Sequence, residues 1–282
     1  MKSALIILNY NDGERTRDLL NKIRGYADPG HIVIVDNASD DGSFEMLKAE
    51  ADDRVHVIRK DDNGGYARGN NTGALYALKN FAPDILLFAN PDVFFTGDTV
   101  DAMVKALKDD PELAGVAPLV RKGYNVWDLP GFAGILESLF LIIFNLDKRR
   151  IRLKLEKSGT AVAEAGVIEG SFFAVDARKF REIQGFDERT FLYCEENILA
   201  RRFKNCGYKM AVLTDHRYDH LHSASIKKIY RSSKAAAFHN FRDSFGVYNK
   251  YYLKTNPVQD VIFDICWYLG YIERVIYDLI KR

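Results

Sequence analysis

Apolar and polar stretches alternate regularly along roughly the first 110 residues. Short apolar runs, of which residues 4–8 are wholly apolar, are typical of strands buried on both faces, and they are separated by segments with apolar residues at helical spacing. We expect strands at 4–8, 31–35, 55–59 and 84–89, and helices at 15–24, 43–49, 68–79 and 96–108. Alternating strands and helices predict an α/β fold with a mostly parallel sheet and right-handed crossovers.

The second half of the chain is less regular. Residues 131–146 are largely apolar, and residues 148–157 then alternate basic and apolar side chains. Residues 227–282 are aromatic-rich and helical in pattern, with a break near 255–257. Between these segments we expect a strand at 169–175, a helix at 195–204 and a strand at 208–213. The sequence contains no internal repeat.

Composition narrows the class of protein. The chain has 282 residues, 40 Lys and Arg against 39 Asp and Glu, and a net charge of +1, which disfavours nucleic acid as a partner. Apolar residues make up 47% and charged residues 28%, as in ordinary globular proteins. The three cysteines form no C-x-x-C pair, which excludes a zinc ribbon or thioredoxin-type motif and predicts reduced thiols.

The distribution of apolar residues bears on localisation. The run at 4–8 is too short for a signal peptide, and no stretch approaches the roughly 18 apolar residues of a spanning helix. We therefore expect a cytoplasmic protein that can also bind peripherally to the inner face of the cell membrane. Two segments could provide that contact, 131–146 with the basic run after it and 261–282, although either could instead pack on the domain or join two copies of the chain.

Three polar clusters follow predicted strands, at residues 9–12, 36–43 and 90–92. Turn chemistry could explain any one of them, because Asn, Asp, Gly and Ser are turn formers. In parallel α/β sheets, however, the ligand binds outside the carboxyl ends of the strands. Three such clusters at successive strand ends therefore predict a binding site at that edge.

Individual residues in these clusters suggest a chemistry. Asp92, with Asn90 two residues before it, suits Mg²⁺ or Mn²⁺ held partly by substrate phosphates, although it could instead cap the next turn. Asp36 could accept hydrogen bonds from a base or ribose. The glycine-rich segment 63–71 opens a helix, where backbone amides favour an anion, but a plain tight turn is the alternative.

Two further groups are candidates for chemistry. Glu195 and Glu196 are adjacent acids near a predicted helix start. One of them could be a general base, or both could simply stabilise the helix through its dipole. His220 and His222 form a His-x-His pair that on a strand would put both rings on one face, as in a metal site, or could be a solvated pair on a loop.

Seven motifs occur in a recognisable order between residues 4 and 225. They are I-I-L-N-Y-N at 6–11, V-D-N-A-S-D-D-G-S at 35–43, N-G-G-Y-A-R-G-N-N at 63–71, N-P-D-V at 90–93, G-S-F-F-A-V at 170–175, G-F-D-E-R-T-F-L-Y-C-E-E at 185–196 and H-L-H-S-A-S at 220–225. With them the chain resembles family-2 glycosyltransferases of the GT-A fold, especially the bacterial rhamnosyltransferase-like branch. The resemblance implies a Rossmann-like sheet in residues 1–225, with a nucleotide-sugar half at 1–115 and an acceptor half at 116–225, followed by a helical extension at 226–282.

The resemblance also implies an activity. It predicts an inverting, metal-dependent transfer of rhamnose or a hexose from a nucleoside-diphosphate sugar to a glycan or lipid-linked glycan, with Mg²⁺ or Mn²⁺ as cofactor. It assigns the metal to Asp92 and His220 and the general base to Glu196, with Glu195 as the fallback. The donor would be bound by Asn9, Tyr10, Asn11, Asp36, Asn37, Asn63, Gly64, Gly65, Tyr66, Arg68, Asn71 and Asn90.

The chain departs from the family pattern at two positions. Asn90 stands where the family's D-x-D motif begins with Asp, and Glu196 stands where the base is usually Asp. These departures keep open a catalytically silent nucleotide-sugar-binding protein or scaffold. A nucleotidyltransferase is disfavoured, because residues 9–15 lack the Gly- and basic-rich loop that such enzymes commonly carry after their first strand.

Overall fold

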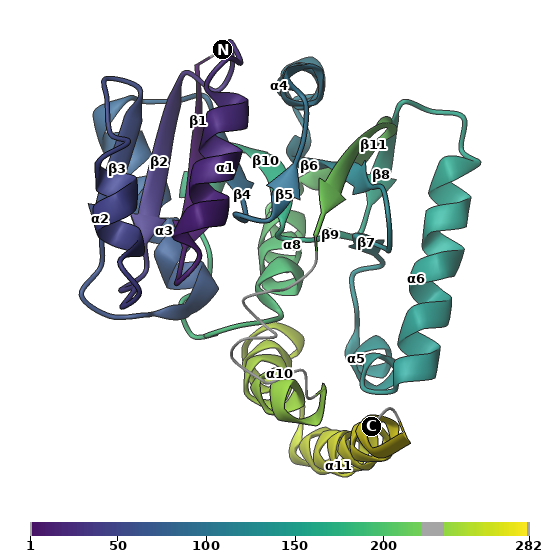
Figure 1. The fold of residues 1–282 in the computed structure, drawn as a ribbon. Coiled ribbons are helices and arrows are strands. Elements are labelled where there is room, and N and C mark those ends of the chain that lie inside the picture. The colour runs from purple at the N-terminus through teal and green to yellow at the C-terminus, as the bar shows by residue number, and fades with distance from the viewer. Residues whose placement is uncertain (1, 222–233, 281–282) are drawn as a thin grey trace.

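The computed structural model describes residues 2–221 and 234–280 (Figure 1). The described strands are β1 (Ser3–Asn9), β2 (His31–Asp36), β3 (Val55–Arg59), β4 (Ile85–Ala89), β5 (Val93–Phe94), β6 (Leu113–Val120), β7 (Val126–Trp127), β8 (Val162–Ala165), β9 (Val167–Ile168), β10 (Phe172–Asp176) and β11 (Lys209–His220). The described helices are α1 (Gly13–Ile23), α2 (Ser43–Lys48), α3 (Gly65–Asn80), α4 (Gly97–Asp109), α5 (Phe132–Ser138), α6 (Leu141–Glu156), α7 (Ala177–Glu182), α8 (Glu195–Asn205), α10 (Lys234–Tyr248), the π-helical turn η1 (Asn249–Leu253) and α11 (Pro257–Ile280).

One mixed sheet organises the described part of the chain, with strand order β3-β2-β1-β4-β10-β6-β11-β5 and β8 paired with β11. The strands β3, β2, β1 and β4 are mutually parallel, as the alternation of the first half predicts. β10 is antiparallel to both β4 and β6. The α/β fold expected from the sequence is confirmed.

Two apolar cores lie on the two faces of this sheet. Successive β1 residues alternate between them: Ile6 packs with α3, α7 and α8, whereas Leu5 packs with α1, α2 and α4. Because the period of a strand is two residues, a wholly apolar strand fills both cores at once. Figure 1 shows these helices flanking the sheet.

The expectations for the second half needed correction: β7, β8, β9 and α7 were not expected, and three further segments differ. β6 was missed, because Gly115 and Pro118 resemble loop residues although all eight of its residues are buried. The strand expected from 169 begins only at Phe172, since residues 169–171 form a loop. β11 extends past Leu213 to His220, because its last residues pair with the end of β6 and with β5.

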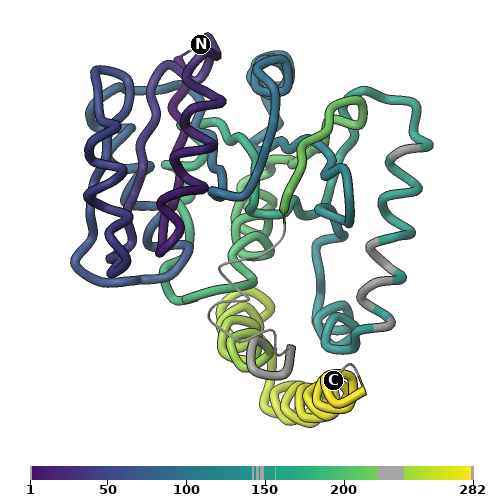
Figure 2. Tube along the Cα trace, in the orientation of Figure 1, coloured from purple at the N-terminus to yellow at the C-terminus, as the bar shows by residue number. Residues whose placement is uncertain are grey.

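The last described helices form a separate layer below the sheet (Figures 1 and 2). α10, η1 and α11 share a third apolar core with α5 and the start of α8, in which Phe238, Tyr248 and Trp267 are buried. A break between η1 and α11 falls near 255–257, as expected. Among the residues that the structure describes, no helix has both the length and the hydropathy needed to cross a membrane.

Candidate active site

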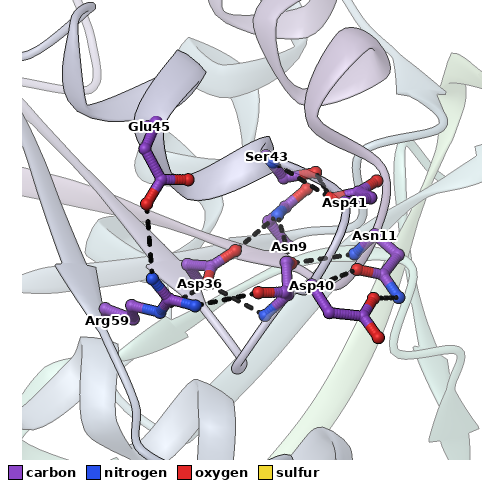
Figure 3. Close-up of polar contacts among 9 residues, drawn as sticks. Asn9, Asn11, Asp36, Asp40, Asp41, Ser43, Glu45 and Arg59 are labelled. Atoms are coloured by element: carbon purple, nitrogen blue, oxygen red, sulfur yellow. Dashed lines mark hydrogen bonds and ion pairs between the residues drawn. The ribbon is translucent and has the colours of Figure 1, made fainter.

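Polar side chains at the ends of β1 and β2 are tied together by hydrogen bonds (Figure 3). Asn9 pairs in register with Asp36, and its Nδ2 donates to Asp36 Oδ1 at 2.9 Å. Asn11 Nδ2 donates to Asp40 Oδ1 at 2.8 Å, and the backbone N–H of Asp40 donates to Asn11 Oδ1 at 3.0 Å. These bonds shape the loops after both strands, so they build one wall of the site.

A cavity of about 320 Å³ opens at this edge of the sheet. It brings together residues from all three polar clusters, from the start of α3 and from the start of α8. Its polar lining consists of Tyr10, Asp12, Asn37, Asn63, Tyr66, Asn90, Asp92, Glu169, Ser171, Tyr193, Glu195, Glu196 and His220. Convergence of separate chain segments on one cavity, with polar groups set among apolar ones such as Leu8 and Phe191, is what a ligand site requires. We call it the donor cavity below.

Asp92 and His220 meet in the donor cavity because β5 pairs with the end of β11. His220 is in register with Val93, so its Nε2 lies 3.4 Å from Asp92 Oδ1. Glu169 Oε1 lies 3.9 Å from the other ring nitrogen, Nδ1. Burial lowers the pKa of His220, but the two carboxylates outweigh burial and raise that pKa above its ordinary 6.5. The part of the donor cavity beside Asp92 and Glu169 therefore favours a positive charge.

The same residues suit a divalent cation in part. Carboxylate oxygens and an imidazole nitrogen are ligands that Mn²⁺ accepts, and Mg²⁺ accepts the carboxylates. Within the described ranges, however, no group of three or more His, Cys, Asp or Glu side chains is arranged to enclose a metal. A metal here would need oxygens from a bound ligand to complete its coordination. His222, the second histidine of the predicted pair, lies outside the described residues.

Glu195 and Glu196 begin α8 and have different surroundings. Glu195 is buried, and its Oε1 has no hydrogen-bond partner among the described residues. Burial, and then the neighbouring carboxylate of Glu196, raise the pKa of Glu195 well above its ordinary 4.5. Glu196 is only half-buried, and its Oε1 accepts the backbone N–H of Gly170 at 3.1 Å. Glu196 is thus the better placed of the two to exchange a proton with a ligand.

Two glycines allow the close approaches that form the donor cavity. Gly65 has φ +80°, and a Cβ there would lie 2.1 Å from the carbonyl oxygen of Phe191. A Cβ on Gly170 would lie 2.9 Å from the Tyr66 hydroxyl and 3.1 Å from Glu196 Oε1. Side chains at these positions would push α3 away from the 191–196 segment. This close approach explains why glycine occurs at 65 in the 63–71 motif and at 170 in the 170–175 motif.

The burial of Glu195 leads to a prediction about pH. A carboxyl whose pKa is raised by folding binds its proton more tightly in the folded state. The resulting stability is fully present below about 4.5, the ordinary value, and is lost as the pH rises through the raised value. We expect Glu195→Gln, which stays neutral, to lose less stability than the wild type toward alkaline pH. Melting temperatures across pH should diverge by a few degrees; parallel curves would contradict the prediction.

Six of the residues predicted to bind a donor lie outside the lining of the donor cavity. Asn9, Asn11 and Asp36 hold the wall described above. Arg68 is exposed and pairs with Asp62 at 2.7 Å. Asn71 bonds in both directions to the backbone of Phe186, through Nδ2 at 3.0 Å and Oδ1 at 2.9 Å. The sixth is Gly64, the residue before α3.

Glu169 was missed as a site residue. It follows β9 and precedes the G-S-F-F-A-V motif, and it borders the donor cavity beside His220. The signal available was an acid directly before a recognised motif, but it was interpreted as the first residue of a strand. Asp12 and Tyr193 also line the cavity without having been singled out.

Comparison with known proteins identifies the family. Residues 4–167 match the model of glycosyl transferase family 2, which spans more than half of the chain. The chain belongs to this family. It is therefore a glycosyltransferase, and the recognition made from the seven motifs is confirmed.

Similar proteins of known name agree with this assignment. The chain is 25% identical to the low-salt glycan biosynthesis hexosyltransferase Agl10 of Haloferax volcanii, over 89% of this chain and 77% of the relative. It is 24% identical to the rhamnosyltransferase WbbL of Escherichia coli, over 64% of this chain and 78% of the relative. An N-acetylglucosaminyl-diphospho-decaprenol L-rhamnosyltransferase of Mycobacterium tuberculosis is also 24% identical, over 64% of this chain and 62% of the relative.

Solved structures show the fold of this family 2 glycosyltransferase. A mannosyltransferase from Pyrobaculum calidifontis, in complex with GDP-Man and Mn²⁺, has a TM-score of 0.63 at 17% identity, covering 100% of this chain and 76% of the other. GalNAc-T7, with UDP, GalNAc and Mn²⁺, has the same TM-score of 0.63 at 13% identity, covering 100% and 58%. The expected GT-A fold is confirmed.

Proposed function

We propose that this glycosyltransferase transfers rhamnose or a hexose, with inversion, from a nucleoside-diphosphate sugar to a glycan or lipid-linked glycan. The observation that carries the proposal is one cavity whose lining includes Glu196, Asp92 and His220. Such a cavity offers a proton acceptor and a place for diphosphate charge within reach of one bound sugar. Inversion needs a single displacement and no covalent intermediate.

The nucleotide would occupy the part of the donor cavity nearest β1 and β2. Asn37 is buried there, and its Nδ2 donates to Asn63 Oδ1 at 2.7 Å. Its Oδ1 is enclosed by the protein and has no hydrogen-bond partner within the described ranges. Tyr10 and Tyr66 also line the cavity, and the Tyr66 hydroxyl donates to the Gly170 carbonyl at 2.5 Å, which leaves the Tyr10 hydroxyl for a ligand. This arrangement suits a nucleotide but does not select one base.

Glu196 would be the general base. The acceptor hydroxyl attacks the anomeric carbon while its proton passes to the Glu196 carboxylate. The bond between the anomeric carbon and the diphosphate oxygen breaks, and its electron pair leaves with the diphosphate. The N–H of Gly170 holds Glu196 Oε1 in place for this transfer. Burial raises the pKa of Glu195, which favours its neutral form and would limit the negative charge beside the base.

Mg²⁺ or Mn²⁺ would be held by Asp92 and His220, with Glu169 close to the imidazole. A divalent cation at this place would neutralise the charge that develops on the departing diphosphate. Asn90 borders the cavity, and its backbone N–H donates to the Ser171 carbonyl at 2.8 Å. We assign Asn90 to donor binding, as the resemblance implies.

A donor screen tests the proposal. Purified protein is incubated with dTDP-rhamnose, UDP-glucose, UDP-galactose and UDP-N-acetylglucosamine, each with Mg²⁺ or Mn²⁺, and released nucleoside diphosphate is measured. One donor should be turned over well above the others, and the Glu196→Gln protein serves as the blank. Binding of a donor without release under any condition would favour the silent nucleotide-sugar-binding protein.

We also propose peripheral contact with the cytoplasmic face of the membrane, through α11. The structure buries Phe263 and Trp267, so these two residues of the candidate surface do not contribute to it. The opposite side of α11 is apolar and exposed along the helix, at Val258, Val261, Ile262, Ile265, Tyr268, Leu269, Ile272, Ile276, Leu279 and Ile280. A continuous apolar face of this kind is typical of an interaction surface.

Sedimentation with anionic vesicles separates the two candidate membrane surfaces. We expect the wild type to sediment at low salt and the double variant Ile265→Glu, Ile272→Glu to stay in the supernatant. The double variant Arg149→Glu, Arg150→Glu tests the basic run on α6 in the same way. If this run binds the vesicles, sedimentation should fall in the variant and should also fall when salt is added to the wild type. No sedimentation of the wild type at low salt would refute contact through either surface.

A further inference from the structure

Residues 187–194 form an irregular segment directly before α8. Three of its side chains, Phe191, Leu192 and Tyr193, line the donor cavity. The segment ends on Tyr193 and Cys194 with φ of +75° and +69°, a left-handed conformation that costs free energy in residues other than glycine. Surrounding contacts must therefore hold it in place. Because α8 begins at the next residue, the position of this segment also decides where Glu196 lies.

Asp187, at the start of the 187–194 segment, is a buried carboxylate that accepts hydrogen bonds from two directions. Arg189 donates to its Oδ1 from within the segment, through the backbone N–H at 3.0 Å and through Nε at 2.8 Å. Tyr252 of η1 donates its hydroxyl to Asp187 Oδ2 at 2.5 Å. This third bond crosses from the C-terminal helices to the segment.

The charge state of Asp187 strengthens the bond from Tyr252. Burial by itself would raise the pKa of Asp187, but the bonds from Arg189 and Tyr252 outweigh burial and lower that pKa to about 2. Burial and the neighbouring carboxylate raise the pKa of Tyr252 to about 12. At neutral pH the carboxyl is therefore ionised and the phenol keeps its proton. Hydrogen bonds to an ionised acceptor are among the stronger ones in proteins.

Two further contacts join the 187–194 segment to α10. Ser244 is buried, and its Oγ donates to the Leu192 carbonyl at 2.9 Å. The Tyr193 ring stacks on Phe241, with centroids 4.1 Å apart and planes 17° apart. On the other side, a backbone N–H in the first turn of α3 donates to the Phe191 carbonyl at 3.0 Å. The segment is thus held between α3 and the C-terminal helices.

The C-terminal helices contact the segment at its start and again near its end. Figure 1 shows α10 next to α8, and α10 also forms part of the wall of a second cavity, of about 420 Å³, that Glu196 borders. A shift of the segment would move a wall of the donor cavity and the start of α8 together. A misplacement of about 1 Å caused far from the chemistry can slow a reaction roughly 10²-fold.

We propose that Tyr252 and Ser244 are positioning residues for the transfer reaction, because they hold the 187–194 segment and thereby set the donor-cavity wall and Glu196. The inference rests on the proposed function, in which Glu196 is the base, and adds to it a role for the C-terminal helices. Neither residue borders the donor cavity, so Tyr252 acts through Asp187 and Ser244 acts through the backbone of Leu192.

Kinetics of Tyr252→Phe test the proposal, because this substitution removes only the hydroxyl that Asp187 accepts. Tyr251→Phe is the matched control: Tyr251 is exposed, and phenylalanine keeps the ring whose centroid lies 3.8 Å from the Arg189 guanidinium. With whichever of the four screened donors is turned over, we expect Tyr252→Phe to lower kcat/KM for the donor roughly tenfold, below the 10²-fold of a full misplacement because other contacts remain. Tyr251→Phe should match the wild type.

The donor KM separates positioning from a loss of folded protein. A smaller folded fraction lowers the apparent kcat and leaves KM unchanged, whereas a displaced cavity wall raises KM for the donor. We therefore expect Tyr252→Phe to raise the donor KM well below its melting temperature. Ser244→Ala removes the bond to the Leu192 carbonyl and should raise the donor KM in the same direction, so it decides the question if Tyr252→Phe folds poorly.

Hydrogen exchange measured by mass spectrometry tests the position of the segment without any substrate. We expect faster exchange in peptides that cover residues 187–196 of Tyr252→Phe, unchanged exchange in β1 to β4, and the wild-type pattern in Tyr251→Phe. Faster exchange confined to η1 and α11 would mean that the hydroxyl stabilises only the C-terminal helices. That result would overturn the inference.

Asp187→Asn tests whether Tyr252 acts through Asp187. Both substitutions weaken the same hydrogen bond, so the double variant should lose less kcat/KM than the product of the two single losses. Losses that multiply would show that Tyr252 acts by another route and would contradict the proposal.

The outcomes also separate this inference from the proposed function. If the wild type turns over none of the donors, the proposed function fails, and hydrogen exchange still decides whether Tyr252 holds the segment. If a donor is turned over while Tyr252→Phe and Ser244→Ala keep the wild-type kcat and donor KM, only the positioning role is refuted.

Discussion

Glu196→Gln is expected to lower turnover by roughly 10²-fold or more, the usual contribution of a general base. Glutamine keeps the length of the side chain, and its amide oxygen can still accept the Gly170 N–H that Glu196 Oε1 accepts at 3.1 Å. The substitution removes only the ability to take the acceptor proton. Donor binding should therefore remain close to that of the wild type, and turnover with saturating donor and acceptor is the measurement that detects the loss.

Glu195→Gln is the matched control for this experiment. The two acids are adjacent, but Glu195 is buried and its pKa is raised, which favours the neutral form that glutamine mimics. We expect this variant to keep most of its turnover. If Glu195→Gln is inactive and Glu196→Gln is active, the base is one residue earlier than we propose.

Asp92→Ala is expected to weaken donor binding and to lower turnover by at least the 10- to 100-fold that loss of an outer-shell partner of a metal site costs. Asp92 is buried and faces His220 in the donor cavity, and its removal leaves His220 as the main metal ligand that we propose. Calorimetric titration of the donor with Mn²⁺ or Mg²⁺ measures the change in affinity. The same titration in excess chelator measures how much of the wild-type affinity depends on metal.

Asp219→Ala is the control for Asp92→Ala. Asp219 precedes His220 on β11, but it is exposed and pairs with Arg121 at 3.1 Å. Its loss should leave donor affinity unchanged, because exposed ion pairs contribute little. Full activity of the wild type in excess chelator would remove the metal from the mechanism, and Asp92 would then need another role.

The first half of the fold could be predicted because its signal is local. In residues 31–35 every position after His31 is apolar, and side chains on both faces of β2 are indeed buried. Parallel strands place their carboxyl ends at one edge, so the meeting of the clusters at 9–12, 36–43 and 90–92 followed without knowledge of any contact. The seven motifs then identified the family from residue type and order alone.

The antiparallel half could not be predicted in this way, because its strands depend on their partners. β6 contains Gly115 and Pro118 and forms a strand because β10 and β11 lie on either side of it. The same pairing decides where His220 lies, since only the register of β11 against β5 brings its ring to Asp92. Register between distant segments is set by packing and has no local signature.

Residue order along the chain was sufficient to propose which acids carry the chemistry, and the tertiary structure decided what surrounds each of them. Glu195 and Glu196 are neighbours with the same side chain, yet one is buried and the other borders two cavities. Contacts between segments far apart in sequence bring Glu169 close to His220 and make α10 a wall of a second cavity. The pKa of a side chain, its access to a ligand and its distance from other groups depend on which surfaces fold against it, whereas its chemical type is given by the sequence alone.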